Sequence, residues 1–377
     1  MNTSLSLAEL IGERVKGLQE YAPEPMEQVA TRLNLPLGQL IKLDANENPY
    51  GPTKHTLQIL NGHLDYHRYP DAISRRLRQA IGHYIDMDPA QIIAGNGSDE
   101  LIDLVLRLFR PGPSGGGIGE LIDCPPTFGM YQFYGTTNDL RVTTIPRLAD
   151  FAVDVARIEA LCAENPVPRL LFLASPNNPD GGVLPDADLE RLLELPLLVV
   201  LDEAYVEFGA SSRVKWVAER ENLIVLRTFS KWAGLAGLRV GYGVFPAALM
   251  TALWRLKSPY NVNCVAQMAA LATLESLDEA RANVAKIIAE RQRFLGKLRE
   301  IPFLQVYDTQ ANYVLCRPQG VATETIREAM ERRGIILRYF NSPGLEGCIR
   351  FTVGTPMQDE AVLIVLRGIA QGGNDGH

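Results

Sequence analysis

One short segment combines hydroxyl, amine and guanidinium side chains, namely Thr228, Ser230, Lys231 and Arg239, and it follows the apolar run 223–226. Such a run is typical of a buried strand, so these side chains would leave the sheet at its carboxyl edge, where α/β proteins bind small molecules. The hydroxyls and the arginine can hold a phosphate beside the lysine. A lysine that is partly desolvated and close to cationic groups can react as a nucleophile. The segment favours a Schiff base with a phosphorylated aldehyde cofactor; taken alone, it fits a solvated surface lysine equally well.

Composition narrows the class of protein. The chain has 377 residues, of which 46% are hydrophobic and 21% charged, which is typical of a globular protein large enough for two domains. A net charge of −7 provides no general basic field for nucleic acid or an anionic membrane. The five scattered cysteines form no C-x-x-C pair, and no leader or eighteen-residue apolar segment stands out. These features predict a cytoplasmic protein with reduced thiols. His63 and His67 lack a third ligand, so we expect no metal site.

Polar side chains follow three further predicted strands. The turn 95–100 (GNGSDE) joins strand 91–94 to an apolar helix over 101–109, and the N-terminus of a helix attracts anions. An asparagine pair ending in Asn178 stands between prolines after strand 170–174, and Asp202 ends the apolar run 197–201. A carboxylate at the end of a buried strand needs a positive partner, and a pyridinium nitrogen would serve.

The alternation of strands and helices indicates the domain organisation. It predicts an α/β fold with a mostly parallel sheet in a large domain over 41–260. Residues 1–40 form an amphipathic helix (5–18) and a polar arm, and residues 261–377 form a connecting helix and a smaller α/β domain. The segment 42–52, which includes Asn46, is either a connecting loop or a rigid binding segment. Phe128, beside a sheet edge, is either a core residue or a stacking platform for a flat ring.

Together these elements resemble the fold type I pyridoxal-phosphate enzymes, specifically the class I and II aminotransferases. The likeness narrows to the histidinol-phosphate aminotransferase family and covers residues from about 21 to 368. It rests on the segments LDANENPYG (43–51), RYP (68–70), GNGSDE (95–100), PPTFGMY (125–131) and CIRFTVG (348–354).

The resemblance implies the roles of the cofactor site. Lys231 would form the Schiff base and move the proton between the substrate α-carbon and the cofactor, while Asp202 would pair with the pyridinium nitrogen. Asn178 and Tyr205 would donate hydrogen bonds to the ring hydroxylate, and Phe128 would stack on the ring. The cofactor phosphate would be bound by Ser98, Asp99, Thr228, Ser230 and Arg239. Tyr69 would reach that phosphate from a second subunit, so the resemblance implies a homodimer.

The resemblance also implies a reaction between L-histidinol phosphate and 2-oxoglutarate, giving imidazole acetol phosphate and L-glutamate. Arg350 would bind the carboxylate and Arg338 the substrate phosphate, with Tyr21 and Asn46 completing the substrate site. Asp180 and Glu24 depart from the family pattern, which has threonine and glycine there. An aromatic amino-acid aminotransferase and a phosphothreonine decarboxylase-type lyase remain open as alternatives, as does a non-catalytic cofactor-binding protein. The missing G-x-G-x-x-G fingerprint disfavours a nicotinamide oxidoreductase.

Overall fold

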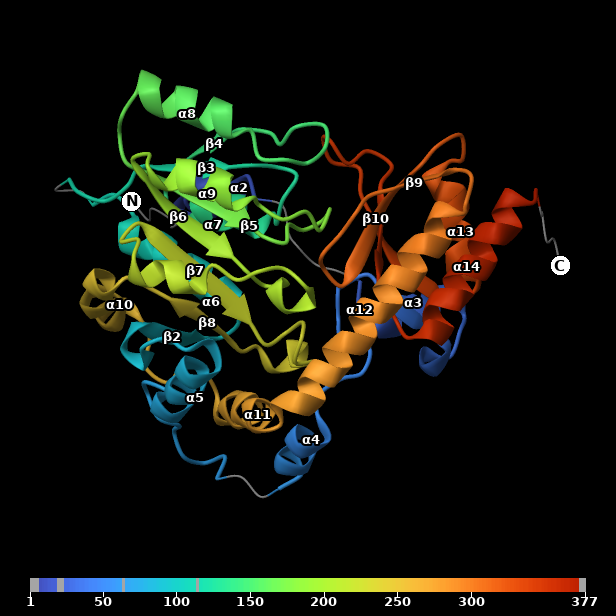
Figure 1. The fold of residues 1–377 in the computed structure, drawn as a ribbon, viewed down its shortest axis with the longest axis horizontal. Coiled ribbons are helices and arrows are strands. Elements are labelled where there is room, and N and C mark those ends of the chain that lie inside the picture. Colours follow the sequence, from blue (N-terminus) through green and yellow to red (C-terminus); the bar gives the residue numbers. More distant parts are fainter. Residues whose placement is uncertain (1–6, 19–23, 63–64, 113–114, 373–377) are drawn as a thin grey trace, which may run out of the picture.

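The computed structural model describes residues 7–18, 24–62, 65–112 and 115–372, and they form two sheets with helices packed on them (Figure 1). The larger sheet has seven strands, and every neighbouring pair is parallel except the two that involve its one reversed strand. In spatial order the strands are β2 (Ile92–Gly95), the reversed β8 (Gly241–Val244), β7 (Leu223–Thr228), β6 (Leu197–Asp202), β5 (Arg169–Ala174), β3 (Glu120–Asp123) and β4 (Arg141–Thr144). This arrangement confirms the predicted α/β class with a mostly parallel sheet.

Helices cover both faces of the large sheet and make a three-layer unit. Every residue of β5, β6 and β7 is buried, as expected for parallel strands covered on both faces. One apolar core lies under α6 (Ser98–Phe109), α7 (Met130–Thr137) and α10 (Met250–Leu256). The core on the other face includes residues of α5 (Arg75–Ile85), α8 (Val155–Glu164), α9 (Asp186–Leu193) and α11 (Cys264–Glu275), and α4 (Lys54–Leu60) packs on α11.

The smaller sheet has five strands and receives one of them from the N-terminal part of the chain. Its order is β1 (Ile41–Leu43), β11 (Ile335–Tyr339), β12 (Ile349–Thr352), β10 (Tyr313–Pro318) and β9 (Leu304–Val306), and only β1 and β11 are parallel. The predicted large domain begins at residue 41, whereas in the structure residues 41–43 pair with β11 of the small sheet. The other helices of the C-terminal part are α12 (Leu277–Arg299), α13 (Thr323–Arg332) and α14 (Pro356–Ala370), with α3 (Met26–Leu33) nearby.

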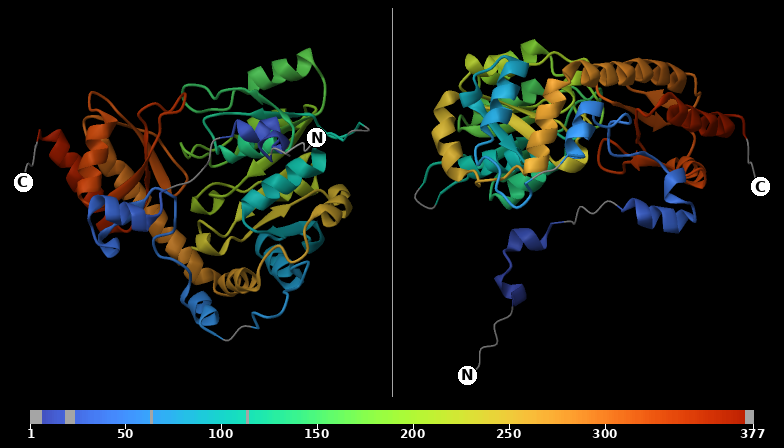
Figure 2. Two further views of the ribbon diagram at one scale, coloured as in Figure 1. Left: turned by 180° about the vertical axis from the view of Figure 1, so that it is seen from behind. Right: turned by 90° about the horizontal axis from the view of Figure 1, so that it is seen from below.

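Helix α12 connects the two units, running from beside α11 to the small sheet (Figures 1 and 2). At the other end of the chain, the prediction of one helix over 5–18 is wrong within the described residues. Two short helices, α1 (Leu7–Leu10) and α2 (Glu13–Lys16), are separated at Gly12, whose ψ of 137° is extended. Among the described residues, no helix combines the length and apolarity needed to cross a membrane, and no three metal-ligating side chains cluster together.

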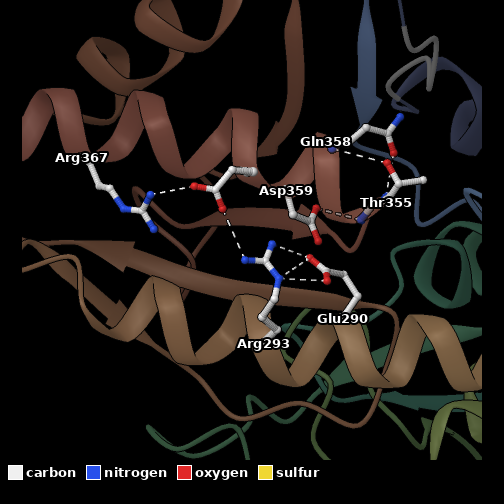
Figure 3. A network of polar contacts seen from close by, with 8 residues as sticks. Glu290, Arg293, Thr355, Gln358, Asp359 and Arg367 are labelled. Atoms are coloured by element: carbon white, nitrogen blue, oxygen red, sulfur yellow. Dashed lines mark hydrogen bonds and ion pairs between the residues drawn. The ribbon is translucent and has the colours of Figure 1, made fainter.

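A polar network fixes α14 against α12 (Figure 3). Thr355 and Gln358 form a capping box at the start of α14. The fully buried Asp359 accepts a 2.9 Å hydrogen bond from the Gly354 N–H, close after β12, and its other oxygen has no hydrogen-bond partner. Glu290 of α12 is held by Arg293 at 2.7 Å. Burial above all, and also the neighbouring Glu290 carboxyl, raise the pKa of Asp359 to about 8.

We expect Asp359→Asn to stabilise the protein, and more so at pH 8 than at pH 5. A carboxyl whose pKa is raised by folding keeps its proton while the unfolded chain loses one, so unfolding free energy falls as pH rises from about 4 to about 8. Asparagine keeps the oxygen that faces Gly354 and cannot ionise. Urea unfolding should give a gain of about 5 kcal/mol at pH 8 and about 2 kcal/mol at pH 5. A gain that does not depend on pH would contradict this account.

Candidate active site

The carboxyl ends of β5, β6 and β7 meet one edge of the large sheet, and the loop after β1 and the strand β12 approach the same place. This edge is where open α/β sheets bind ligands. Lys231 follows β7, Asp202 ends β6 and Asn178 follows β5. The structure therefore brings together groups that lie far apart in the sequence.

The Lys231 amine lies between the two units. It donates a 3.0 Å hydrogen bond to the carbonyl oxygen of Ala45, in the loop after β1, and lies 6.0 Å from the centre of the Tyr205 ring. Burial, and after it the charge of Arg350, lower the pKa of Lys231 to about 8. A substantial fraction of the amine is therefore neutral near pH 8, as a nucleophilic lysine requires.

Asp202 is 4% exposed and accepts two hydrogen bonds. The Tyr131 hydroxyl donates to one oxygen at 2.8 Å, and the Ala204 N–H donates to the other at 3.0 Å. Burial raises the pKa of Asp202 to about 6, while these two donors act in the opposite direction. No cationic side chain among the described residues forms an ion pair with it. The positive partner that the sequence analysis required is therefore not a side chain of the described part of the chain.

Tyr131 is a site residue that sequence reasoning missed. It is fully buried on α7 and meets the Phe128 ring edge to face, with 5.6 Å between ring centres. Phe128 and Tyr131 both belong to the segment 125–131, with Tyr131 three residues after Phe128. Tyr131 and Asp202 are 71 residues apart in the sequence, so only the packing of α7 on the sheet reveals their hydrogen bond.

Asn46 and Tyr205 form the wall beside the lysine. The Asn46 amide donates a 3.0 Å hydrogen bond to the Tyr205 hydroxyl, and its oxygen accepts one from Thr352 at 3.2 Å. The backbone of Asn46 has a φ of 55°, a left-handed conformation that asparagine tolerates better than most residues. Asn312 adds a 3.0 Å bond from its amide to the Asn46 carbonyl. The segment 42–52 is thus a rigid part of the site, which favours the binding interpretation over that of a simple connecting loop.

Arg350 is buried at the same edge and is held only by neutral oxygens. Its guanidinium donates to the side-chain oxygen of Asn178 at 2.5 Å and to the carbonyl of Asp44 at 2.6 Å, and its Nε has no partner. Burial lowers the pKa of Arg350 from its ordinary value. A buried cation without a carboxylate partner is costly, so this arginine is suited to receiving an anion from a ligand.

Arg338 lies beside Arg350 on the neighbouring strand. The two residues are directly paired in the antiparallel register of β11 and β12, so their side chains point to the same face of the sheet. Their guanidinium carbons lie 5.7 Å and 5.8 Å from the centre of the Phe340 ring. Arg338 is exposed and Arg350 is buried, so the pair offers one shallow and one deep cationic group.

The predicted phosphate-binding residues also converge. Helix α6 begins at Ser98, so the free N–H groups of its first turn include those of Ser98 and Asp99. Arg239 pairs with Asp99 at 3.0 Å and lies so close to Gly97 that a Cβ there would be 2.6 Å from its Nη2. Separately, the Thr228 hydroxyl donates to the Ser230 hydroxyl at 2.9 Å. These backbone donors, hydroxyls and guanidinium, named here the anion-binding corner, are groups suited to holding an anion.

One predicted residue, Tyr69, has no contact with this site among the described residues. Tyr69 is 82% exposed and stacks on Tyr260 with 4.6 Å between ring centres. Tyr21 lies outside the described residues. Of the two departures from the family pattern, Asp180 is buried and accepts a 2.7 Å bond from Gly182, while Glu24 pairs with Arg32 at 3.0 Å.

Comparison with known proteins assigns this arrangement to a family. A family model for "Aminotransferase class I and II" matches residues 38–369. The chain belongs to the class I and II aminotransferases. This aminotransferase is 46% identical over 375 residues to a histidinol-phosphate aminotransferase from Roseiflexus castenholzii, covering 97% of this chain and 99% of the relative. It is 44% identical over 354 residues to the chloroplastic histidinol-phosphate aminotransferase of Nicotiana tabacum, and the match covers 93% of this chain and 84% of the relative.

A solved structure shows the same fold for this aminotransferase. The histidinol-phosphate aminotransferase of Sinorhizobium meliloti, in complex with pyridoxal-5'-phosphate, superposes with a TM-score of 0.85. The match covers 98% of this chain and 99% of the other at 23% identity. The two-unit α/β architecture is therefore that of this class of aminotransferases.

Proposed function

We propose that this aminotransferase uses pyridoxal phosphate to exchange the amino group of L-histidinol phosphate for the keto oxygen of 2-oxoglutarate. The products are imidazole acetol phosphate and L-glutamate, in a step of histidine biosynthesis. The observation that carries the proposal is the pairing of Arg338 with Arg350 beside the Lys231 amine. The names of the relatives, at 44–46% identity over nearly the whole chain, support the same reaction.

The residues at the sheet edge fit pyridoxal phosphate. The cofactor has a ring nitrogen that can be protonated, and the buried Asp202 has no cationic side chain paired with it in the described part of the chain. It has a phosphate, and the first turn of α6 with Arg239 offers donors for one. Its aldehyde requires an amine with a lowered pKa, which Lys231 provides. When bound, the cofactor supplies this aldehyde and a ring that accepts electrons from the substrate α-carbon.

Each of these side chains has its own role in the proposed reaction. Lys231 holds the cofactor and moves the proton at the substrate α-carbon, and Asp202 keeps the ring nitrogen protonated by its negative charge. Tyr205 and Asn178 contact the ring hydroxyl, and Phe128 packs on the ring face. Ser98, Asp99, Thr228, Ser230 and Arg239 hold the phosphate. Each charge-assisted hydrogen bond contributes roughly 1.5–3 kcal/mol, so several together retain the cofactor between turnovers.

The two arginines explain how one site accepts two substrates. Arg350 binds a carboxylate of 2-oxoglutarate or glutamate in bidentate fashion. Arg338, being exposed, reaches the phosphate of histidinol phosphate, and Tyr21 and Asn46 complete the substrate site. Because bidentate arginine accepts carboxylate and phosphate alike, the site needs no large rearrangement between the two half-reactions.

The test is a half-reaction without a keto acid. Purified enzyme in the aldehyde form is mixed with L-histidinol phosphate, and the visible absorbance of the lysine-bound cofactor is followed. We expect rapid bleaching that 2-oxoglutarate reverses. Bleaching by phenylalanine but not by histidinol phosphate would establish an aromatic aminotransferase instead, and release of carbon dioxide from phosphothreonine would establish a lyase.

Arg338→Ala is expected to impair histidinol phosphate more than glutamate. Loss of a charge-assisted contact to a phosphate should raise the KM for histidinol phosphate by about tenfold or more. The KM for glutamate, whose carboxylate meets Arg350, should change by less than about threefold. Steady-state kinetics with each amino donor measure this split, and equal losses for both would exclude the phosphate role. Arg333→Ala, an exposed arginine that precedes β11, is the matched control.

We propose that the active unit is a homodimer in which Tyr69 of each subunit reaches the cofactor phosphate of the other. The support is that Tyr69 is a large exposed aromatic that stacks on Tyr260, which is itself 44% exposed. Two exposed stacked rings are typical of a surface that a partner covers. Light scattering should give twice the chain mass of 41.6 kDa, and a mass of one chain would contradict the proposal.

We also propose that the enzyme works in the cytoplasm. All five cysteines are free thiols, which a reducing compartment preserves. Cell fractionation followed by activity measurement would test this, and activity confined to another compartment would contradict it.

A further inference from the structure

A buried side-chain network joins the two loops that carry proposed ring contacts, and the roles assigned above do not use it. Its centre is Asn177, which lies after β5 and is fully buried. The Asn177 amide oxygen accepts a 2.8 Å hydrogen bond from the Thr127 hydroxyl. Its NH2 group donates to the Pro126 carbonyl at 3.1 Å and to the Asp180 carboxylate. These partners fix the orientation of the amide, because a carbonyl and a carboxylate can only accept.

Asp180 uses both of its oxygens in this network. One accepts from the Asn177 NH2 group, and the other accepts a 2.7 Å hydrogen bond from the Gly182 N–H. Burial raises the pKa of Asp180, while the charge of Arg147 and these two donors act in the opposite direction. Threonine, which the family pattern has at this position, and asparagine each offer one accepting oxygen in place of two. The carboxylate is therefore matched to its two donors.

The backbone of the same loop is held separately, by the small unit. The Tyr313 hydroxyl of β10 donates to the Asn177 carbonyl at 2.5 Å, and the Gln310 N–H donates to the Gly181 carbonyl at 2.9 Å. Neither bond involves the Asp180 side chain. We therefore expect the loop to stay in place when Asp180 is changed, while the Asn177 amide loses a partner that orients it.

The two side chains at the centre of the network are each followed by a proposed ring contact. Asn178 follows Asn177, and its amide oxygen accepts from Arg350 at 2.5 Å, so its NH2 group is left to donate to the ring hydroxylate. Phe128 follows Thr127 and is proposed to pack on the ring face. A displaced Asn177 amide would therefore disturb both contacts.

We propose that Asp180 is a positioning residue for the cofactor ring. By orienting the Asn177 amide, it holds Asn178 and Phe128 at the separation that a ring between them requires. This role deepens the proposed function and rests on it, because both ring contacts belong to that proposal. Asp180 itself takes part in no chemical step.

The test is a pH titration of the visible band of the lysine-bound cofactor. A hydrogen bond donated to the ring hydroxylate competes with the one that the hydroxylate accepts from the protonated nitrogen of this linkage. A weaker bond from Asn178 should therefore raise the pKa of that nitrogen. We expect this pKa to rise by about 0.5–1 in Asp180→Asn.

Asp123→Asn is the matched control. It neutralises another buried carboxyl that interacts with the Arg147 charge, but Asp123 forms no hydrogen bond with Asn177. The pKa of the linkage should stay within about 0.2 of its normal value in this variant. Urea unfolding of both cofactor-free variants measures their stability separately. An equal rise of the pKa in the control would overturn the proposal, because any buried charge change would then have the same effect.

A double-mutant cycle tests whether the effect passes through Asn177. Thr127→Val removes the hydroxyl that donates to the other end of the same amide. The rises of the pKa caused by Thr127→Val and Asp180→Asn should not add in the double variant, because both act on one side chain. Additive effects, or an unchanged titration in Asp180→Asn, would overturn the proposal.

If Asp180→Asn does not fold, Asp180→Thr takes the same measurements with the same criteria, since its hydroxyl still accepts one of the two bonds. The absence of a visible band in the unmodified enzyme would contradict the proposed function itself. A normal band that the Asp180 variants leave unchanged would contradict only the positioning role, so the two failures are distinguishable.

Discussion

Lys231→Ala is expected to abolish turnover, lowering kcat by about 10⁴-fold or more, while the protein still binds pyridoxal phosphate. The lysine is the buried amine of the site, its pKa is lowered to about 8, and it is positioned by the Ala45 carbonyl at 3.0 Å. Alanine removes both the attachment point and the proton carrier. The anion-binding corner at α6 and the Asp202 carboxylate remain, so the cofactor should still be held without a covalent bond.

Two measurements on the purified variant check this expectation. The visible spectrum should show free aldehyde in place of the lysine-bound form, and the half-reaction with histidinol phosphate should show no proton transfer. Lys297→Ala changes a partly exposed lysine on α12 that pairs with Glu300; it is the control and should behave like the unmodified enzyme. Turnover by Lys231→Ala within about tenfold of normal would show that another group carries the proton.

Asp202→Asn is expected to lower kcat by about 10³-fold or more without releasing the cofactor. Asparagine has nearly the same shape and keeps an oxygen for the Ala204 N–H, but it has no charge to hold a proton on the ring nitrogen. Burial already raises the pKa of the Asp202 carboxyl to about 6. Its negative charge therefore depends on the hydrogen bonds from Tyr131 and Ala204 and on the protonated ring nitrogen of the cofactor.

Tyr131→Phe tests a milder change at the same carboxylate than Asp202→Asn does. It removes the 2.8 Å hydrogen bond but leaves the carboxylate, so it should raise the pKa of Asp202 and cost only about tenfold in kcat. The pH profile of kcat/KM distinguishes the two, because the acid limb should move to higher pH in Tyr131→Phe. Near-normal activity of Asp202→Asn would show that the electron-accepting role of the ring does not depend on this carboxylate.

Local sequence was sufficient for the strands with an unbroken apolar run. The predicted strand 170–174 lies within β5 and the apolar run 197–201 lies within β6, because strands that are buried on both faces need apolar residues throughout. Helix α6 begins at Ser98, three residues before its predicted start at Leu101, because the glycine turn and the acidic first turn are themselves helix-starting signals. The predicted helix over 5–18 failed at Gly12, where the chain is extended.

Sequence by itself determined the chemistry of this protein. The lysine, the aspartate and the anion-binding turn each follow an apolar run, and parallel strands place their carboxyl ends at one edge whatever the rest of the chain does. Only the tertiary structure decided which groups meet across the two units. Pairing of β1 with β11 brings Ala45 and Asn46 to the lysine, the β11 and β12 register sets Arg338 beside Arg350, and the packing of α7 places Tyr131 on Asp202. These contacts depend on long-range packing between distant segments, which no local pattern of residues encodes.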